Sequence, residues 1–239
     1  MKHAKLLAAV LVLFSAPALA QVSGNITAIS EYMFRGVAQE GGAALQGSLD
    51  YSREDGWYSG VWGSNCSECG GNEIDFYGGW TGEVGRGVTL DAGVVYYLFT
   101  EDAEVSGAPD IDYPEIYLGA GYDGLSGTLY YSNKLVDELS DIPGSDQTGF
   151  YFTADYTHAL REGLELVLQV GRSWGDGVDA VLGDAYTDYS VTVVKTLDDG
   201  FSLSAAVIDT DLDADATATT PAREDDPKFV VGLSKDFAF

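Results

Sequence analysis

Ten ionisable residues at alternate chain positions, opposite apolar residues, are the first candidates for chemistry in this sequence. Nine of them are acidic and one is basic. Successive side chains of a β-strand point to opposite faces, so these groups would share one side of a sheet. A water-filled space lined by carboxylates attracts cations and repels anions. The ten candidates for lining such a space are Glu31, Arg35, Asp50, Glu73, Asp75, Asp91, Glu115, Asp155, Glu165 and Asp236.

Arg35 is the single base of that set and the only basic residue of the first predicted strand, over 24–37. One interpretation is a local anion contact or a constriction. The other is that the guanidinium neutralises nearby acids such as Glu31. We favour the second, because acids outnumber bases on this face.

Cys66 and Cys69 form a lone Cys-x-x-Cys motif. A zinc site needs two further Cys or His ligands, and the sequence offers none nearby. A thioredoxin-like redox motif belongs to a different fold. Exported compartments are oxidising, so we expect a disulfide between Cys66 and Cys69 rather than a metal or redox site.

Four aspartates alternate near the C-terminus and superficially resemble a calcium-binding loop. Ala214 occupies the place of the essential glycine, and no Glu stands at the twelfth position, so an EF-hand is excluded. Weak and unspecific divalent binding is what this segment allows. We predict no dedicated metal site and no cofactor. The four residues are Asp209, Asp211, Asp213 and Asp215.

Composition narrows the function classes further. The 239 residues include 12 Lys+Arg against 38 Asp+Glu, a formal net charge of −26, which argues against nucleic-acid binding. Only two histidines are present, and His158 falls on the apolar face of its predicted strand, so no Ser-His or Asp-His site is available. We predict that the protein is not an enzyme.

Apolar and polar residues alternate from Gly24 onward, which predicts β-strands. Most of the segments have nine or more residues, close to the roughly 9–11 that a tilted strand needs to cross a bilayer. Twelve strands are expected, over 24–37, 43–52, 57–64, 73–82, 87–98, 113–123, 125–132, 148–160, 164–173, 186–196, 201–209 and 228–239.

Short and long connections alternate between these strands. Short turns such as Asp123-Gly124 suit tight hairpins, whereas the six other connections hold 20 acidic residues and only two bases, Lys134 and Arg223. This asymmetry is typical of outer-membrane barrels, with periplasmic turns and longer extracellular loops. The acidic loops are a solvated surface, a cation-collecting vestibule, or a site for bridging to lipopolysaccharide through divalent ions. A soluble exported β-protein is the competing interpretation.

Both ends of the chain carry targeting features. Lys2 and Lys5, the apolar run 6–14 and a small-residue site ending at Ala20 predict a cleaved signal peptide over 1–20. Residues 21–239 then form a single barrel domain. The last strand ends in Phe239, which resembles the signal that the barrel-assembly machinery recognises.

Five segments carry a family resemblance. They are SEYMFRGVAQ (30–39), ALQGSLDYS (44–52), WYSGVWGSN (57–65), EIDFYGGW (73–80) and YPEIYLGAGY (113–122). These segments resemble the TorF-type porin family of bacterial outer-membrane barrels, which is otherwise of unknown function. The likeness runs from about residue 23 to the C-terminus and is densest in the first hundred residues after the signal peptide. It implies an outer-membrane barrel and a pore-like role, with no catalytic residues to carry over.

These observations together predict an all-β, antiparallel transmembrane barrel of about twelve strands in the bacterial outer membrane. The expected function is a porin-like channel for passive passage of small hydrophilic solutes or ions, with a preference for cations. The expected partners besides the solute are membrane lipid and lipopolysaccharide. The alternative is a non-conducting barrel that is structural or binds partners through its acidic loops.

Overall fold

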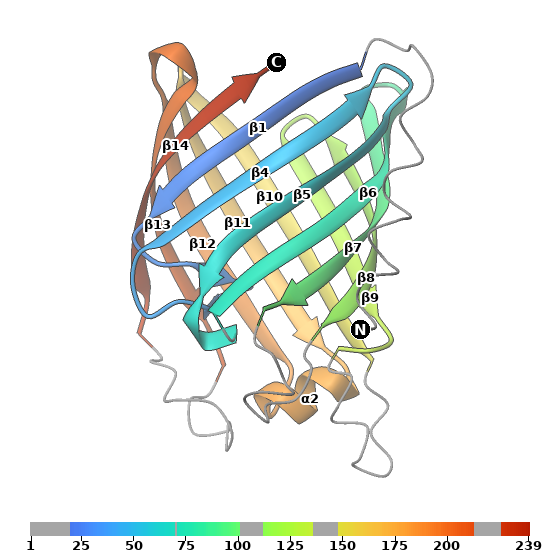
Figure 1. Cartoon of the computed structure of the whole chain (residues 1–239), viewed down its shortest axis with the longest axis vertical. Helices are drawn as coiled ribbons and strands as arrows, with labels where there is room; N and C mark the ends of the chain where they lie inside the picture. The colour runs from blue at the N-terminus through green and yellow to red at the C-terminus, as the bar shows by residue number, and fades with distance from the viewer. Residues whose placement is uncertain (1–19, 70, 101–111, 136–147, 213–225) are drawn as a thin grey trace.

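The described part of the chain forms one closed β-barrel (Figure 1). The computed structural model describes residues 20–69, 71–100, 112–135, 148–212 and 226–239. Antiparallel strands follow one another around the ring, and β1 closes it by pairing with both β14 and β4. The predicted all-β barrel of twelve strands is therefore confirmed. Its strands are β1 (Ala20–Ile29), β4 (Ala44–Arg53), β5 (Trp57–Cys66), β6 (Gly71–Gly85), β7 (Val88–Phe99), β8 (Tyr113–Tyr122), β9 (Leu125–Ser132), β10 (Gly149–Arg161), β11 (Leu164–Trp174), β12 (Tyr186–Thr196), β13 (Phe201–Thr210) and β14 (Lys228–Ala238).

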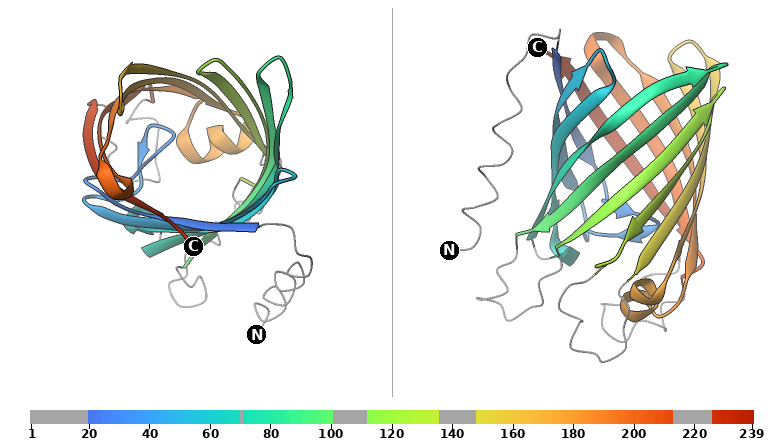
Figure 2. Two further views of the ribbon diagram at one scale, coloured as in Figure 1. Left: turned by 90° about the horizontal axis from the view of Figure 1, so that it is seen from above. Right: turned by 90° about the vertical axis from the view of Figure 1, so that its right-hand side faces the viewer.

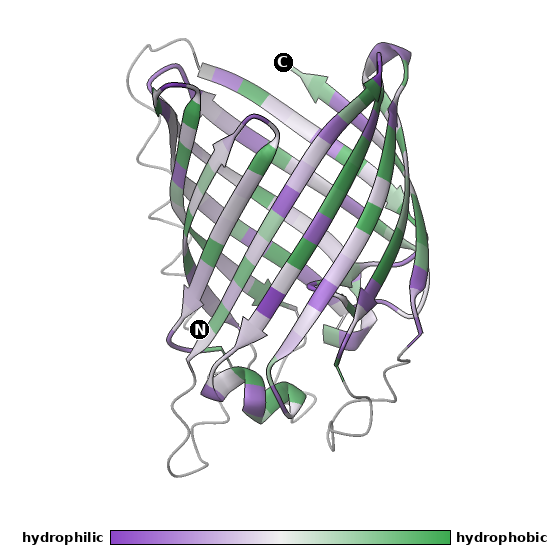
Figure 3. Cartoon of the chain, turned by 180° about the vertical axis from the view of Figure 1, so that it is seen from behind, coloured by the Kyte–Doolittle hydropathy of each residue, from purple (hydrophilic) through white to green (hydrophobic). Residues whose placement is uncertain are grey.

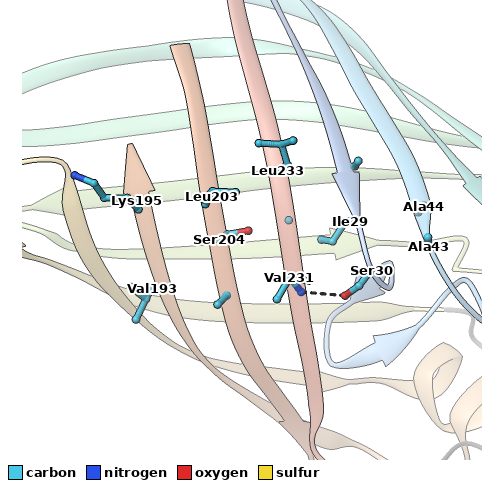
Figure 4. A pocket seen from close by; sticks show the side chains of 13 residues that line it. Ile29, Ser30, Ala43, Ala44, Val193, Lys195, Leu203, Ser204, Val231 and Leu233 are labelled. Carbon is cyan, nitrogen blue, oxygen red and sulfur yellow. Dashed lines mark hydrogen bonds between the residues drawn. The ribbon is translucent and has the colours of Figure 1, made fainter. Parts of the chain in front are cut away.

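Side chains alternate between the outer wall and the lumen. Figure 3 shows hydrophobic and hydrophilic residues following one another along the strands. On β8, Ile116 and Leu118 face outward and are 56% and 61% exposed, whereas Tyr113 and Glu115 face inward and are buried. Large apolar side chains cover the outside of the other strands as well. An outer wall of this kind requires an apolar solvent, which favours the membrane barrel over the soluble β-protein.

The two ends of the barrel differ. Tight turns join strands at one end, which we call the short-turn end; at Asp123 and Gly124 both φ angles are positive, as a two-residue hairpin turn requires. The other end, the long-loop end, carries the short helix α2 (Asp176–Leu182) and the 3₁₀ turn η3 (Ser67–Cys69). None of the described helices is long and apolar enough to cross a membrane.

Some predictions fall on residues that the structure does not describe. The signal peptide over 1–20 lies outside the described residues except for Ala20, the first residue of β1. Asp213 and Asp215 also lie outside them.

Candidate functional site

A small hairpin lies inside the barrel (Figure 2, left). The single strand predicted over 24–37 is wrong beyond Ile29, because the chain there turns inward and forms β2 (Met33–Phe34) and β3 (Val37–Ala38), which pair only with each other. Arg35 and Gly36 have φ angles of 50° and 77° and make the two-residue turn between them. Positive φ at two successive residues is incompatible with a continuous strand.

The side chain of Arg35 is fixed on the opposite wall of the lumen. Its two terminal nitrogens donate to the two carboxylate oxygens of Glu115 on β8, at 2.9 and 2.6 Å. The guanidinium carbon also lies 4.3 Å from the ring centre of Tyr151 and 5.1 Å from that of Tyr130. A bidentate ion pair enclosed by aromatic rings holds a guanidinium strongly. Arg35 thus pairs with a lumen acid, which is the second of the two interpretations above. Its partner is Glu115 and not Glu31, the acid named there as an example.

The hairpin touches both sides of the barrel interior. On one side the ring of Phe34 packs edge-on against Tyr97 of β7, with ring centres 5.8 Å apart. On the other side Val37 is buried in a cluster with Val178 of α2, Tyr186 and Leu212. The hairpin therefore crosses and narrows the lumen near the long-loop end.

The base of the hairpin is tied to the turn that contains the two cysteines. The backbone N–H of Glu68 donates to the carbonyl of Gln39 at 3.1 Å. The carboxylate of Glu40 accepts from the backbone N–H of Ser67 at 2.9 Å and from the side-chain amide of Asn65 at 3.0 Å. Slight burial alone would raise the pKa of Glu40, but these hydrogen bonds outweigh it and hold that pKa below its ordinary value.

Cys66 and Cys69 are joined by a disulfide in this turn. The two sulfur atoms and a carboxylate oxygen of Glu73 lie within 4.8 Å of one another. A disulfide offers no thiolate, so this triplet is not a metal site while the bond is intact.

Tyrosines share the lumen with the acids and donate hydrogen bonds to them. Four of the pairs join residues of different strands, and Tyr32, which precedes β2, is bonded to a strand residue, so the pairs brace the interior. The pairs are Tyr32–Glu73 (2.9 Å), Tyr58–Asp91 (2.6 Å), Tyr77–Asp50, Tyr97–Glu115 (3.0 Å) and Tyr151–Asp188 (3.2 Å).

The predicted lining residues fall into three groups. Asp50, Glu73, Asp75, Asp91, Glu115 and Asp155 lie on the inward face, and Asp155 accepts from Thr153 at 3.1 Å. Glu165 and Asp236 keep the inward alternation of β11 and β14 close to the short-turn end. Glu31 lies in the bend between β1 and β2, so it belongs to no barrel strand.

Two of the four alternating aspartates are described, and both accept backbone hydrogen bonds. Asp209 accepts from the N–H of Thr210, and Asp211 from that of Thr187.

Sequence reasoning missed Asp188 and the lumen tyrosines. Asp188 is 2% exposed on β12 and lies between the inward-facing Tyr186 and Ser190. That alternation was a signal for Asp188. No sequence pattern indicates which tyrosine pairs with which acid, because the paired residues are distant in the sequence.

Comparisons with known proteins agree with this geometry. A family model described as a bacterial protein of unknown function (Gcw_chp) matches residues 15–237, and the chain belongs to that family. No curated protein matches the sequence. The fold is similar to that of the KdgM porin (TM-score 0.55, 10% identity, covering 90% of this chain and 99% of that one). It is similar to the NanC porin as well (TM-score 0.58, 9% identity, covering 90% and 98%). The closed twelve-stranded barrel thus resembles the barrels of these two porins in its fold.

Proposed function

We propose that this protein is an outer-membrane channel through which small hydrophilic solutes or ions pass passively, with a preference for cations. The observation that carries the proposal is the acidic lumen crossed by the β2–β3 hairpin. A hairpin folded into a barrel restricts the path, and fixed charges at the restriction select among ions.

The preference for cations follows from the balance of charge inside the barrel. Seven buried or half-buried carboxylates face the described lumen, in addition to the exposed Glu165 and Asp236 near the short-turn end, whereas the charge of Arg35 is taken up by Glu115. Six bases lie in the described barrel strands. Arg53, Arg172, Lys195 and Lys235 keep the outward alternation, Arg161 follows a register shift at the short-turn end of β10, and Lys228 faces inward near the long-loop end. The seven acids are Asp50, Glu73, Asp75, Asp91, Glu115, Asp155 and Asp188.

The remaining parts of the proposal accompany this channel. The signal peptide over residues 1–20 directs export of the chain and is cleaved. The barrel-assembly machinery recognises the last strand, and the barrel contacts phospholipid and lipopolysaccharide. We also propose that it is a TorF-type porin and has no catalytic activity. A KdgM porin structure described as a complex with oligogalacturonate supports solute passage through a barrel of this shape.

A second function is a non-conducting barrel that acts through its acidic loops. The packing of Val37 against α2 favours it, because this contact fills part of the long-loop end. Single-channel recording in a planar bilayer separates the two functions. Discrete current steps support the channel, and insertion without steps supports the closed barrel.

A further inference from the structure

We propose that the barrel holds a calcium ion between the carboxylates of Glu73 and Asp75, beside the base of the hairpin. The proposal deepens the cation preference proposed above, but ion binding does not require that the barrel conducts.

The two carboxylates are buried on the same face of β6. Glu73 is 4% exposed and Asp75 is 9% exposed. They are two residues apart on one strand, and their carboxyl groups lie within hydrogen-bonding reach of each other. Two like charges at this separation repel strongly in a buried environment unless a cation or a proton neutralises them.

The partners of this pair leave one oxygen free. The hydroxyl of Tyr32 donates to Glu73. The Oδ1 atom of Asp75 is buried and has no hydrogen-bond partner. Among the described residues, no basic side chain forms an ion pair with either carboxylate, since Arg35 is bound to Glu115. A buried carboxylate oxygen without a donor is costly, and a bound cation would remove that cost.

The chemistry of the donors selects a hard divalent ion. Two carboxylates and a tyrosine hydroxyl offer only oxygen atoms, which are the ligands of Ca²⁺ and Mg²⁺. Ca²⁺ accepts an irregular arrangement with water completing its shell, whereas Mg²⁺ demands near-ideal octahedral geometry. A divalent charge also balances two carboxylates fully, so we assign Ca²⁺.

Asp188 offers a contrast. Its Oδ2 atom is also buried without a hydrogen-bond partner. A Cβ atom added to Gly171 would lie 2.3 Å from that oxygen, so backbone already occupies the adjoining space. The backbone of Gly171 therefore limits the space on one side of this second orphan oxygen.

The test is isothermal titration of calcium-stripped, detergent-purified full-length protein with CaCl₂ at pH 7.5, together with the unfolding temperature with and without calcium. We expect one saturable site per chain in the wild type. Asp75→Asn should weaken its affinity at least tenfold and abolish the calcium-dependent rise in unfolding temperature. Asp91→Asn removes the same charge from the same lumen, but Asp91 already accepts from Tyr58, so this variant should bind as the wild type does.

Three results would overturn the assignment. The first is no saturable binding in the wild type, which would mean that the two carboxylates share a proton. The second is an equal loss of affinity in Asp75→Asn and Asp91→Asn, which would mean unspecific attraction to the acidic lumen. The third is unchanged binding in Asp75→Asn, which would place the ion on the acidic loops. Heat-modifiable gel mobility shows that each variant has folded, and Glu73→Gln serves as the second variant if Asp75→Asn has not.

Discussion

The guanidinium of Arg35 and the carboxylate of Glu115 are joined by two hydrogen bonds, of 2.9 and 2.6 Å, although the residues are 80 positions apart in the chain. The pair connects the tip of the β2–β3 hairpin to the barrel wall. Glu115 is 1% exposed, so water screens its charge little, and among the described residues Arg35 is the base that forms an ion pair with it. This ion pair is the main electrostatic attachment of the element that narrows the lumen.

Replacing Arg35 should free the hairpin. We expect Arg35→Met to enlarge the single-channel conductance, because Met cannot form the ion pair with Glu115 and the hairpin loses its attachment to the barrel wall. In the double variant Arg35→Met/Glu115→Gln, part of the lost stability should return, with a coupling energy of about 0.5–3 kcal/mol in unfolding experiments.

Arg86→Met is the matched control for this change. Arg86 also has a positive φ and precedes a glycine in a turn, but that turn joins β6 and β7 at the short-turn end. Its replacement should leave the conductance unchanged. Equal effects of Arg35→Met and Arg86→Met would show that the hairpin does not control the aperture.

The lumen acids should set the selectivity. Converting Asp75 and Asp91 to Asn together should weaken the preference for cations without unfolding the barrel, because the amide keeps the shape of the side chain and loses its charge. The reversal potential under a salt gradient measures the change. An unchanged reversal potential would place the two residues away from the conducting path.

The disulfide should steady the base of the hairpin. Without it, the turn that binds Gln39 and Glu40 loses a constraint that is worth about 2 kcal/mol for so short a loop in the chain-entropy account. The variant Cys66→Ser/Cys69→Ser should therefore show more current fluctuation than the wild type. Reductant should raise the current fluctuation of the wild type to the level of the variant and leave the variant unchanged. If reductant raises the fluctuation of both proteins, loss of this disulfide is not its cause.

Glu40 should add a pH-dependent contribution to stability. Its folded-state pKa is lowered, so the contribution is present above the ordinary Glu pKa of about 4.3 and is lost as the pH falls through the folded-state value. The unfolding temperature of the wild type should exceed that of Glu40→Gln at pH 7, and the difference should shrink in acid. A difference that grows on acidification would contradict this sign.

The strands could be predicted from the sequence, whereas the hairpin could not. Outward apolar residues such as Ile116 and Leu118 alternate with inward ones, because the outer wall of the barrel is apolar and the other wall faces the lumen. The segment around Arg35 continues a similar alternation, and only the pair Arg35-Gly36 marks a turn. Whether that turn enters the lumen depends on the ion pair with Glu115. That residue lies 80 positions further along the chain, and the sequence does not show that the two residues meet.

The candidate site was predicted only in its composition. Inward carboxylates such as Asp75 and Asp91 follow from the alternation of their strands. The different environments of the two carboxylates do not follow from the alternation. Asp91 accepts a hydrogen bond from the hydroxyl of Tyr58, two strands away, whereas Oδ1 of Asp75 has no hydrogen-bond partner. Such differences arise from the closure of the barrel.

The most direct test of the central claim is the current through the purified, refolded protein in a planar bilayer under a salt gradient. An acid-lined lumen narrowed by a hairpin predicts discrete conductance steps and a reversal potential of the sign for cations. Steps with an anion-selective reversal potential would contradict the role of the lumen acids. Stable insertion without any steps would contradict the channel itself.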